Sequence, residues 1–150
     1  MVRSSPEIRE VRMSERKPTP FDALLGTRAV RVGEGQSEMS LELRDDHRNR
    51  RGVAHGGVVS ALLDTSLGAA VVSTLAPEEW CGTLELSVQF RDPARHGPLT
   101  GHGRVARRGR GVAFAEGEVR DANGRTVAVA HGVWTIWPAH PDRPQAADQG

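Results

Sequence analysis

The 150-residue sequence predicts an α+β domain in which an antiparallel sheet of five to six strands wraps around one long central helix. Three observations predict this class. Residues 57–75 are apolar almost all the way around a helix. Residues 83–90 alternate between polar and apolar side chains, as half-buried strands do. The order of the elements, two strands, one helix and then four strands, is typical of an antiparallel sheet packed on a helix.

The first half of the chain supplies a hairpin and the helix. Residues 28–33 and 38–44 are the two expected strands of the hairpin. The helix over 57–75 has no proline before Pro77. We expect protein to surround this helix on most sides, because its apolar residues reach most of the way around it: Val58, Val59, Leu62, Leu63, Leu67, Ala70, Val71 and Leu75.

Turn residues separate the four strands of the second half. Pro93 and the Gly97-Pro98 pair end the strand over 83–90. The Arg-Gly-Arg-Gly cluster at 108–111 separates the next two strands. Asn123-Gly124 is a strong hairpin signal. Apolar and polar residues then alternate to the end of a last strand at residue 137.

Composition excludes several classes of protein. The chain has 20 Lys and Arg against 19 Asp and Glu, and this balance argues against nucleic-acid binding as its main task. Cys81 is the only cysteine, so we expect no disulfide within the chain, no cysteine-rich zinc site and a reducing, cytoplasmic setting. The apolar fraction of 37% is lean, which we attribute to polar chain ends and to a core shared between subunits.

We expect one domain over residues 21–138, between a flexible leader (1–20) and a disordered tail (139–150), both polar and rich in proline. The leader lacks the apolar stretch of a signal peptide. The segment 53–76 has Asp64 as its only charged side chain. An ionised Asp in a membrane-spanning helix would cost at least about 2.5–3.5 kcal/mol. We therefore expect a buried helix of a soluble protein and no membrane partner.

The segment most informative about chemistry is 47–57, His-Arg-Asn-Arg-Arg-Gly-Val-Ala-His-Gly-Gly, which runs straight into the helix. Gly56 and Gly57 let another molecule approach the backbone closely. The first-turn N–H groups lie unpaired at the positive end of the helix dipole, where they can stabilise a carbonyl oxygen that becomes an oxyanion. Asn49 and His55 flank this position. A plain glycine-rich helix cap would show the same pattern.

Asp64 is the candidate general base. It follows Gly57 by seven residues, which is about 10 Å along the helix axis. Its neighbours Leu62, Leu63 and Leu67 are apolar, so we expect a partly desolvated carboxylate whose pKa tends to rise. The alternative is an Asp on a narrow exposed stripe of the helix.

These residues resemble the hotdog-fold acyl-CoA thioesterases of the PaaI type, whose hallmark is H-x-N-x-x-G-x-x-H-G-G followed by a helix that bears an acid. Every position of the hallmark is filled, by His47, Asn49, Gly52, His55, Gly56, Gly57 and then Asp64. The resemblance continues through Phe90-Arg91-Asp92-Pro93-Ala94 and covers about residues 21–137.

The resemblance implies a role for each matching residue. The Gly57 N–H polarises the thioester carbonyl with help from Asn49, and His55 orients these groups. Asp64 activates water or attacks directly, and Thr83 holds the water. The active site lies across a homodimer interface, with Asp64 and Thr83 from one subunit and Gly57 from the other. Two such dimers commonly pack into a homotetramer.

Coenzyme A would be part of the substrate, and we expect no separate cofactor. Gly56 allows close approach of the substrate, and the turn with Arg107, Arg108 and Arg110 suits the phosphates of coenzyme A. A solvated hairpin tip is the alternative for this turn. A second cluster beside the helix start offers another site for the phosphates: Arg48, Arg50 and Arg51. We expect no metal site, because four histidines lack metal-ligand spacing: His96, His102, His131 and His140.

The function implied is hydrolysis of an acyl-CoA or aroyl-CoA thioester to the free acid and CoA. A non-catalytic acyl-CoA-binding module is one alternative, although both the helix acid and the glycine pair are present. An acyl-thioester hydratase or dehydratase is another, but its His-Phe-Pro or Gly-Asp-x-Asn-Pro stretch does not occur. Cys81 has no neighbouring base, so we expect an ordinary strand residue. Trp134 and Trp137 should lie on opposite faces of their strand.

Overall fold

The computed structural model describes residues 18–140 and confirms the α+β architecture. Most of the expected leader (1–20) and tail (139–150) lies outside the described residues. The elements follow in this order: α1 (Pro20–Leu25), β1 (Thr27–Gly33), β2 (Gln36–Leu41), the 3-10 turn η2 (Asp45–His47), α2 (Gly56–Val72), β3 (Trp80–Phe90), β4 (Leu99–Arg108), β5 (Val112–Arg120) and β6 (Thr126–Trp137). Two strands, the long helix and four strands therefore occur in the predicted order.

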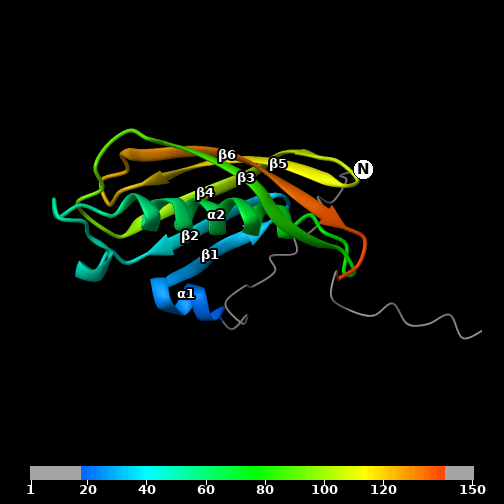
Figure 1. Ribbon diagram of the computed structural model, residues 1–150, viewed down its shortest axis with the longest axis horizontal. Helices are drawn as coiled ribbons and strands as arrows, with labels where there is room; N and C mark the ends of the chain where they lie inside the picture. Colours follow the sequence, from blue (N-terminus) through cyan, green and yellow to red (C-terminus); the bar gives the residue numbers. More distant parts are fainter. Residues whose placement is uncertain (1–17, 141–150) are drawn as a thin grey trace, which may run out of the picture.

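One antiparallel sheet of six strands curves around α2 (Figure 1). Its strand order is β1-β2-β4-β5-β6-β3, so β3 pairs with β6 although β3 directly follows the helix in the chain. The edge strands of the sheet are β1 and β3. In the part of the chain that the structure describes, no helix is long and apolar enough to cross a membrane.

Inward-facing glycines let α2 lie close against the sheet. A Cβ atom at Gly103 would lie 2.6 Å from the Ser66 carbonyl oxygen, and one at Gly117 would lie 2.7 Å from Leu67 Cδ1 and 2.0 Å from the His102 carbonyl oxygen. Any side chain at these positions would push the helix away. Because the helix is this close, seven of its residues are buried: Val59, Leu62, Leu63, Ser66, Leu67, Ala70 and Val71.

The predicted Asn-Gly hairpin is confirmed: β5 and β6 pair antiparallel, and Gly124 adopts a φ of 78° in the turn between them. Asp121 Oδ1 accepts hydrogen bonds from the backbone N–H groups of Asn123 (2.9 Å) and Arg125 (3.0 Å). Burial raises the pKa of Asp121, but these two N–H groups and the Arg125 guanidinium outweigh it, so the pKa lies below its ordinary value.

Strand β3 forms as predicted, and Leu86 and Val88 pack half-buried against the core, but the apolar residues on either side of them are exposed. Leu84 is 66% exposed and Phe90 is 57% exposed. The register with β6 shifts between Thr83 and Glu85, so Leu84 sits in a bulge. Alternation predicts burial only where a second layer covers one face, and along β3, at the sheet edge, the cover is incomplete.

Helix α1 was missed by the sequence analysis. Thr19 caps it through a hydrogen bond from the Asp22 N–H, the Asp22 side chain accepts from the Thr19 N–H, and Gly26 ends it at a φ of 77°. The sequence contains these capping signals, a Thr followed three residues later by an Asp and a Gly at the end of the helix. The helix is only six residues long and buries none of them, so no apolar periodicity marks it. The prediction for the two tryptophans is confirmed: Trp134 is 2% exposed and Trp137 is 38% exposed.

Candidate active site

A tight loop brings the chain to the start of α2. The His55 N–H donates to the His47 carbonyl at 2.8 Å, and the Asn49 N–H donates to the Val53 carbonyl at 2.9 Å. Gly52 closes the loop at a φ of 72°, in the left-handed region that favours glycine. The loop therefore holds Asn49 and His55 on either side of one turn, next to the helix start.

His55 is the N-cap of α2. Its Nδ1 accepts a hydrogen bond from the Gly57 N–H at 2.9 Å. A Cβ atom at Gly57 would lie 3.1 Å from the same Nδ1, so a larger residue at this position would crowd the imidazole ring. The predicted oxyanion donor is therefore bonded to an imidazole in this structure. A substrate carbonyl would have to share or replace that bond.

The structure also defines the surroundings of Asn49. Its Oδ1 accepts a hydrogen bond from the Arg51 N–H at 2.9 Å, which stiffens the loop. The side-chain amide N–H₂ group of Asn49 is then the part that can donate to a ligand.

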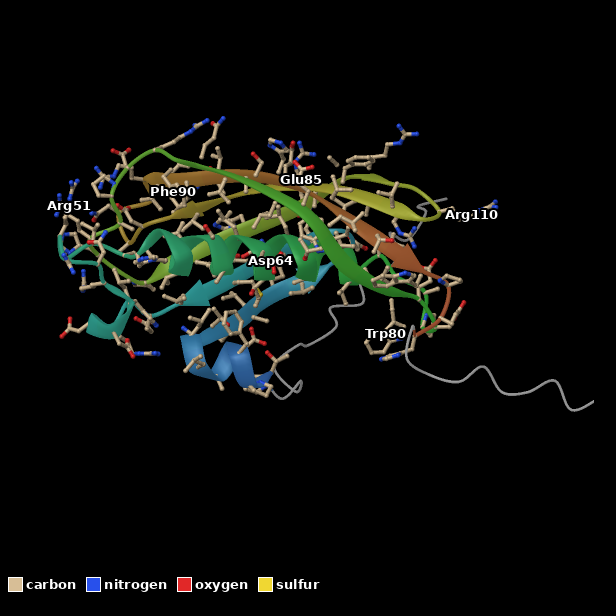
Figure 2. The ribbon with its side chains drawn as sticks, in the orientation of Figure 1. Arg51, Asp64, Trp80, Glu85, Phe90 and Arg110 are labelled. Atoms are coloured by element: carbon tan, nitrogen blue, oxygen red, sulfur yellow. The ribbon has the colours of Figure 1, made fainter. Side chains whose placement is uncertain are left out.

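Asp64 and Thr83 meet although they come from different elements. Thr83 Oγ1, on β3, donates to Asp64 Oδ1, in the middle of α2, at 2.9 Å. Asp64 is half-buried, and Figure 2 places it midway along the helix. The hydroxyl orients the carboxylate and leaves Asp64 Oδ2 available to a water molecule. In the same chain, Gly57 lies two helical turns away, about 10 Å along the axis.

An apolar hollow of about 340 Å³ lies at the start of α2. The ring of Phe90 forms one wall, and its Cζ lies 3.3 Å from where a Cβ atom of Gly56 would be. Ligand sites typically measure about 300–1,000 Å³, so this hollow is at the small end of the range. The sequence did not predict this hollow, because the alternating pattern marks Phe90 only as the last apolar residue of a half-buried strand. Its lining residues are Val53, Ala54, Gly56, Val59, Phe90, Arg91, Asp92, Pro93, Ala94 and Val127.

The arginine turn between β4 and β5 lies apart from the helix start. Figure 2 shows Arg110 at one end of the molecule and Arg51, with Phe90, toward the other. Arg108 forms an ion pair with Glu79. The Ala76 N–H and the Arg108 guanidinium both lower the pKa of Glu79. Arg107 is exposed, as is Arg110, so the turn offers two outward-facing cations rather than the predicted three.

Three further points concern the molecule outside the candidate active site: Cys81, the groups that a metal ion would need, and a hollow on the other face of the sheet. Cys81 is half-buried, and burial raises the pKa of its thiol, so the unreactive protonated form is favoured. Among residues 18–140, no group of three or more His, Cys, Asp or Glu side chains could hold a metal ion. A polar hollow of about 830 Å³ lies on the sheet face opposite α2, between His102, Glu118 and His131, and contains none of the predicted catalytic residues.

Comparisons with known proteins agree with this architecture. The model of the thioesterase superfamily matches residues 51–128. A candidate esterase of Pseudomonas aeruginosa is 34% identical over 122 residues, which cover 80% of this chain and 90% of the relative. A crystal structure from Ralstonia eutropha, described as a candidate thioesterase related to phenylacetic acid degradation, is 32% identical, with a TM-score of 0.75 over 82% of this chain and 95% of the other. A thioesterase family protein from Silicibacter pomeroyi is 26% identical, with a TM-score of 0.76 over 79% of this chain and 89% of the other.

Proposed function

The chain belongs to the thioesterase superfamily, and from this membership we propose that it hydrolyses acyl-CoA or aroyl-CoA thioesters with Asp64 as the general base. The observation that carries the proposal is the hydrogen bond from Thr83 Oγ1 to Asp64 Oδ1 at 2.9 Å. It orients a carboxylate that is otherwise free to accept a proton from water. Family membership supports thioester hydrolysis in general, and the choice of CoA esters and of these residues is our proposal.

The proposed reaction has two steps. Water attacks the thioester carbonyl carbon while Asp64 Oδ2 takes its proton, and the carbonyl oxygen becomes an oxyanion that the Gly57 N–H stabilises at the positive end of α2. The C–S bond then breaks. The electron pair leaves with the CoA sulfur, and the proton returns from Asp64 to the thiolate. The products are a free carboxylic acid and CoA.

His55 competes with the substrate for the oxyanion donor. Its Nδ1 holds the Gly57 N–H at 2.9 Å, so the thioester oxygen takes over this hydrogen bond as the substrate enters. The displaced imidazole and the Asn49 amide then flank the carbonyl. This arrangement protects the helix start when no substrate is bound, because a capped N-terminus is more stable by about 1 kcal/mol.

We propose that the complete site forms between two subunits. Strand β3 leaves one edge unpaired and exposes Trp80, Leu84 and Phe90, and exposed edges of this kind pair with another chain. Helix α2 adds apolar residues that are half-buried (Val58, Ala61 and Ala69) or exposed (Val72). Pairing of β3 with the β3 strand of a second subunit would cover both the strand edge and these residues of α2. A cytoplasmic homodimer, and a homotetramer of two such dimers, are the assemblies that we propose.

The test replaces Asp64 by Asn and measures thiol release from a panel of CoA esters. We expect turnover to fall at least about a hundredfold, since a positioned general base contributes about 10²–10⁴-fold. Glu42→Gln is the matched control, because it removes one exposed carboxylate elsewhere in the chain. Undiminished hydrolysis by Asp64→Asn would refute the mechanism. Binding of acyl-CoA without any turnover would favour a binding module, and hydration of 2-enoyl-CoA without thiol release a hydratase.

A further inference from the structure

Four arginines near the start of α2 have no acidic partner among the described residues: Arg50, Arg51, Arg91 and Arg95. All four are exposed. Elsewhere many arginines are neutralised, for example Arg104 by Glu116 and Arg108 by Glu79. An arginine cluster without counter-charges is the electrostatic complement of an anionic ligand.

Hydrogen bonds join the two segments that carry these arginines, residues 48–54 and residues 91–95. Arg48 Nη1 donates to the carbonyl oxygens of Gly52 (2.8 Å) and Arg95 (3.0 Å), and the Ala54 N–H donates to the Ala94 carbonyl at 2.8 Å. The Arg48 guanidinium also lies with its Nε 3.5 Å from an Asp45 carboxylate oxygen, so its contacts within the protein leave it out of the exposed cluster. Its bonds bring the loop of residues 48–54 and the segment of residues 91–95 together, so the four free arginines belong to one region.

This region adjoins the hollow at the helix start. Arg91 and Asp92 line the hollow together with Phe90 and Gly56. Apolar residues form most of the remaining wall, and among the described residues that line it Asp92 is the one carboxylate. A ligand with a reactive carbonyl at the helix start, an uncharged arm and a multiply charged anionic end would match these features in that order.

We propose that Arg50, Arg51, Arg91 and Arg95 bind the phosphate groups of the CoA part of the substrate. The inference rests on the proposed function, which places the thioester carbonyl at Gly57. Guanidinium groups donate two parallel hydrogen bonds to phosphate oxygens, and the 3′-phosphate and pyrophosphate of CoA supply several such acceptors. The uncharged pantetheine arm crosses the Phe90 hollow. This assignment places the phosphates at the helix start rather than at the turn with Arg107 and Arg110.

The experiment compares two thioesters of the same acyl group, one on CoA and one on N-acetylcysteamine, which has no phosphate. The variant replaces all four arginines by Gln. We expect its KM for the CoA ester to rise about tenfold or more, with kcat and all kinetic constants for the N-acetylcysteamine ester unchanged. The KM of the wild type for the CoA ester should rise with salt, and this dependence should weaken in the variant. Arg107→Gln with Arg110→Gln is the matched control, and its KM should stay close to that of the wild type.

Two results would overturn the assignment. One is an equal rise in KM for both esters when the four arginines are replaced. The other is a rise in KM for the CoA ester alone in the Arg107→Gln and Arg110→Gln control. Calorimetric binding of free CoA to the same variants separates this inference from the proposed function. Weaker CoA binding by the fourfold variant supports the inference even where no ester is hydrolysed, whereas unchanged CoA binding refutes it. Absence of hydrolysis of both esters by the wild type refutes the proposed function alone.

Discussion

The proposal that two subunits share each active site leads to a complementation experiment between two inactive variants. Asp64 and Gly57 lie seven residues apart on one helix, which is about 10 Å along its axis. A general base has to lie within about 2.6–3.2 Å of the heavy atom whose proton it takes, or one water molecule away. The proposed mechanism therefore pairs the Asp64 of one subunit with the Gly57 N–H of the other on one thioester carbonyl.

Each variant removes one half of the site. Asp64→Asn removes the base, and Gly57→Pro removes the backbone N–H while remaining tolerable in the first turn of a helix. Loss of one oxyanion donor costs about 10²–10³-fold in kcat, so each variant alone should be close to inactive. Gly57→Pro also loses the hydrogen bond that the Gly57 N–H donates to His55 Nδ1, which costs about 1 kcal/mol of stability and leaves the protein folded.

The assay mixes equal amounts of the two variants after subunit exchange and measures hydrolysis of a CoA ester. Half of the dimers are then mixed, and in each mixed dimer one of two sites combines an intact Asp64 with an intact Gly57. We expect about a quarter of the wild-type activity to return.

The matched control mixes Asp64→Asn with Thr83→Val. These two residues touch within one chain, so no site of a mixed dimer contains both of them intact. This mixture should show no gain over its two components. If the Asp64→Asn and Gly57→Pro mixture also stays inactive while native mass spectrometry shows mixed dimers, the site is not shared in the way proposed.

Three further predictions concern single residues. Thr83→Val should lower kcat about tenfold, because the lost hydrogen bond to the Asp64 carboxylate is worth about 1.5 kcal/mol, and an unchanged kcat would exclude the positioning role. Gly117→Ala should destabilise the fold by about 3 kcal/mol or more, since its Cβ atom would overlap a backbone carbonyl, whereas Gly111→Ala has open space; equal melting temperatures would contradict this. Asp121 has a lowered pKa, so its stabilising contribution is complete above the unfolded-state pKa of about 3.9 and is lost as the pH falls through the folded-state value. In urea unfolding, Asp121→Asn should therefore be less stable than the wild type at pH 7, with a smaller difference near pH 3, and a constant difference would refute the linkage.

Local features of this fold were predictable because their causes lie within a few residues. The helix α2 follows from an apolar segment without proline, and the β5–β6 hairpin from Asn123-Gly124. The glycine pair at the helix start and the acid at Asp64 were likewise legible, since the motif places them at fixed spacing on one helix.

Other features depend on which segments meet in space. The exposure of Leu84 follows from the position of β3 at the sheet edge, which no pattern within the strand reveals. The ion pair of Arg108 with Glu79 joins residues 29 positions apart, so the sequence alone could not tell a free arginine from a neutralised one.

The sequence by itself determined the α+β class, the order of the elements along the chain and the candidate catalytic residues, because periodicity and turn residues act over short distances. Only the tertiary structure decided that Thr83 orients Asp64, that His55 holds the Gly57 N–H and that Arg91 and Arg95 join the arginines beside the helix start. The physical reason is that hydrogen bonds and counter-charges depend on three-dimensional proximity, which the packing of strand on helix creates.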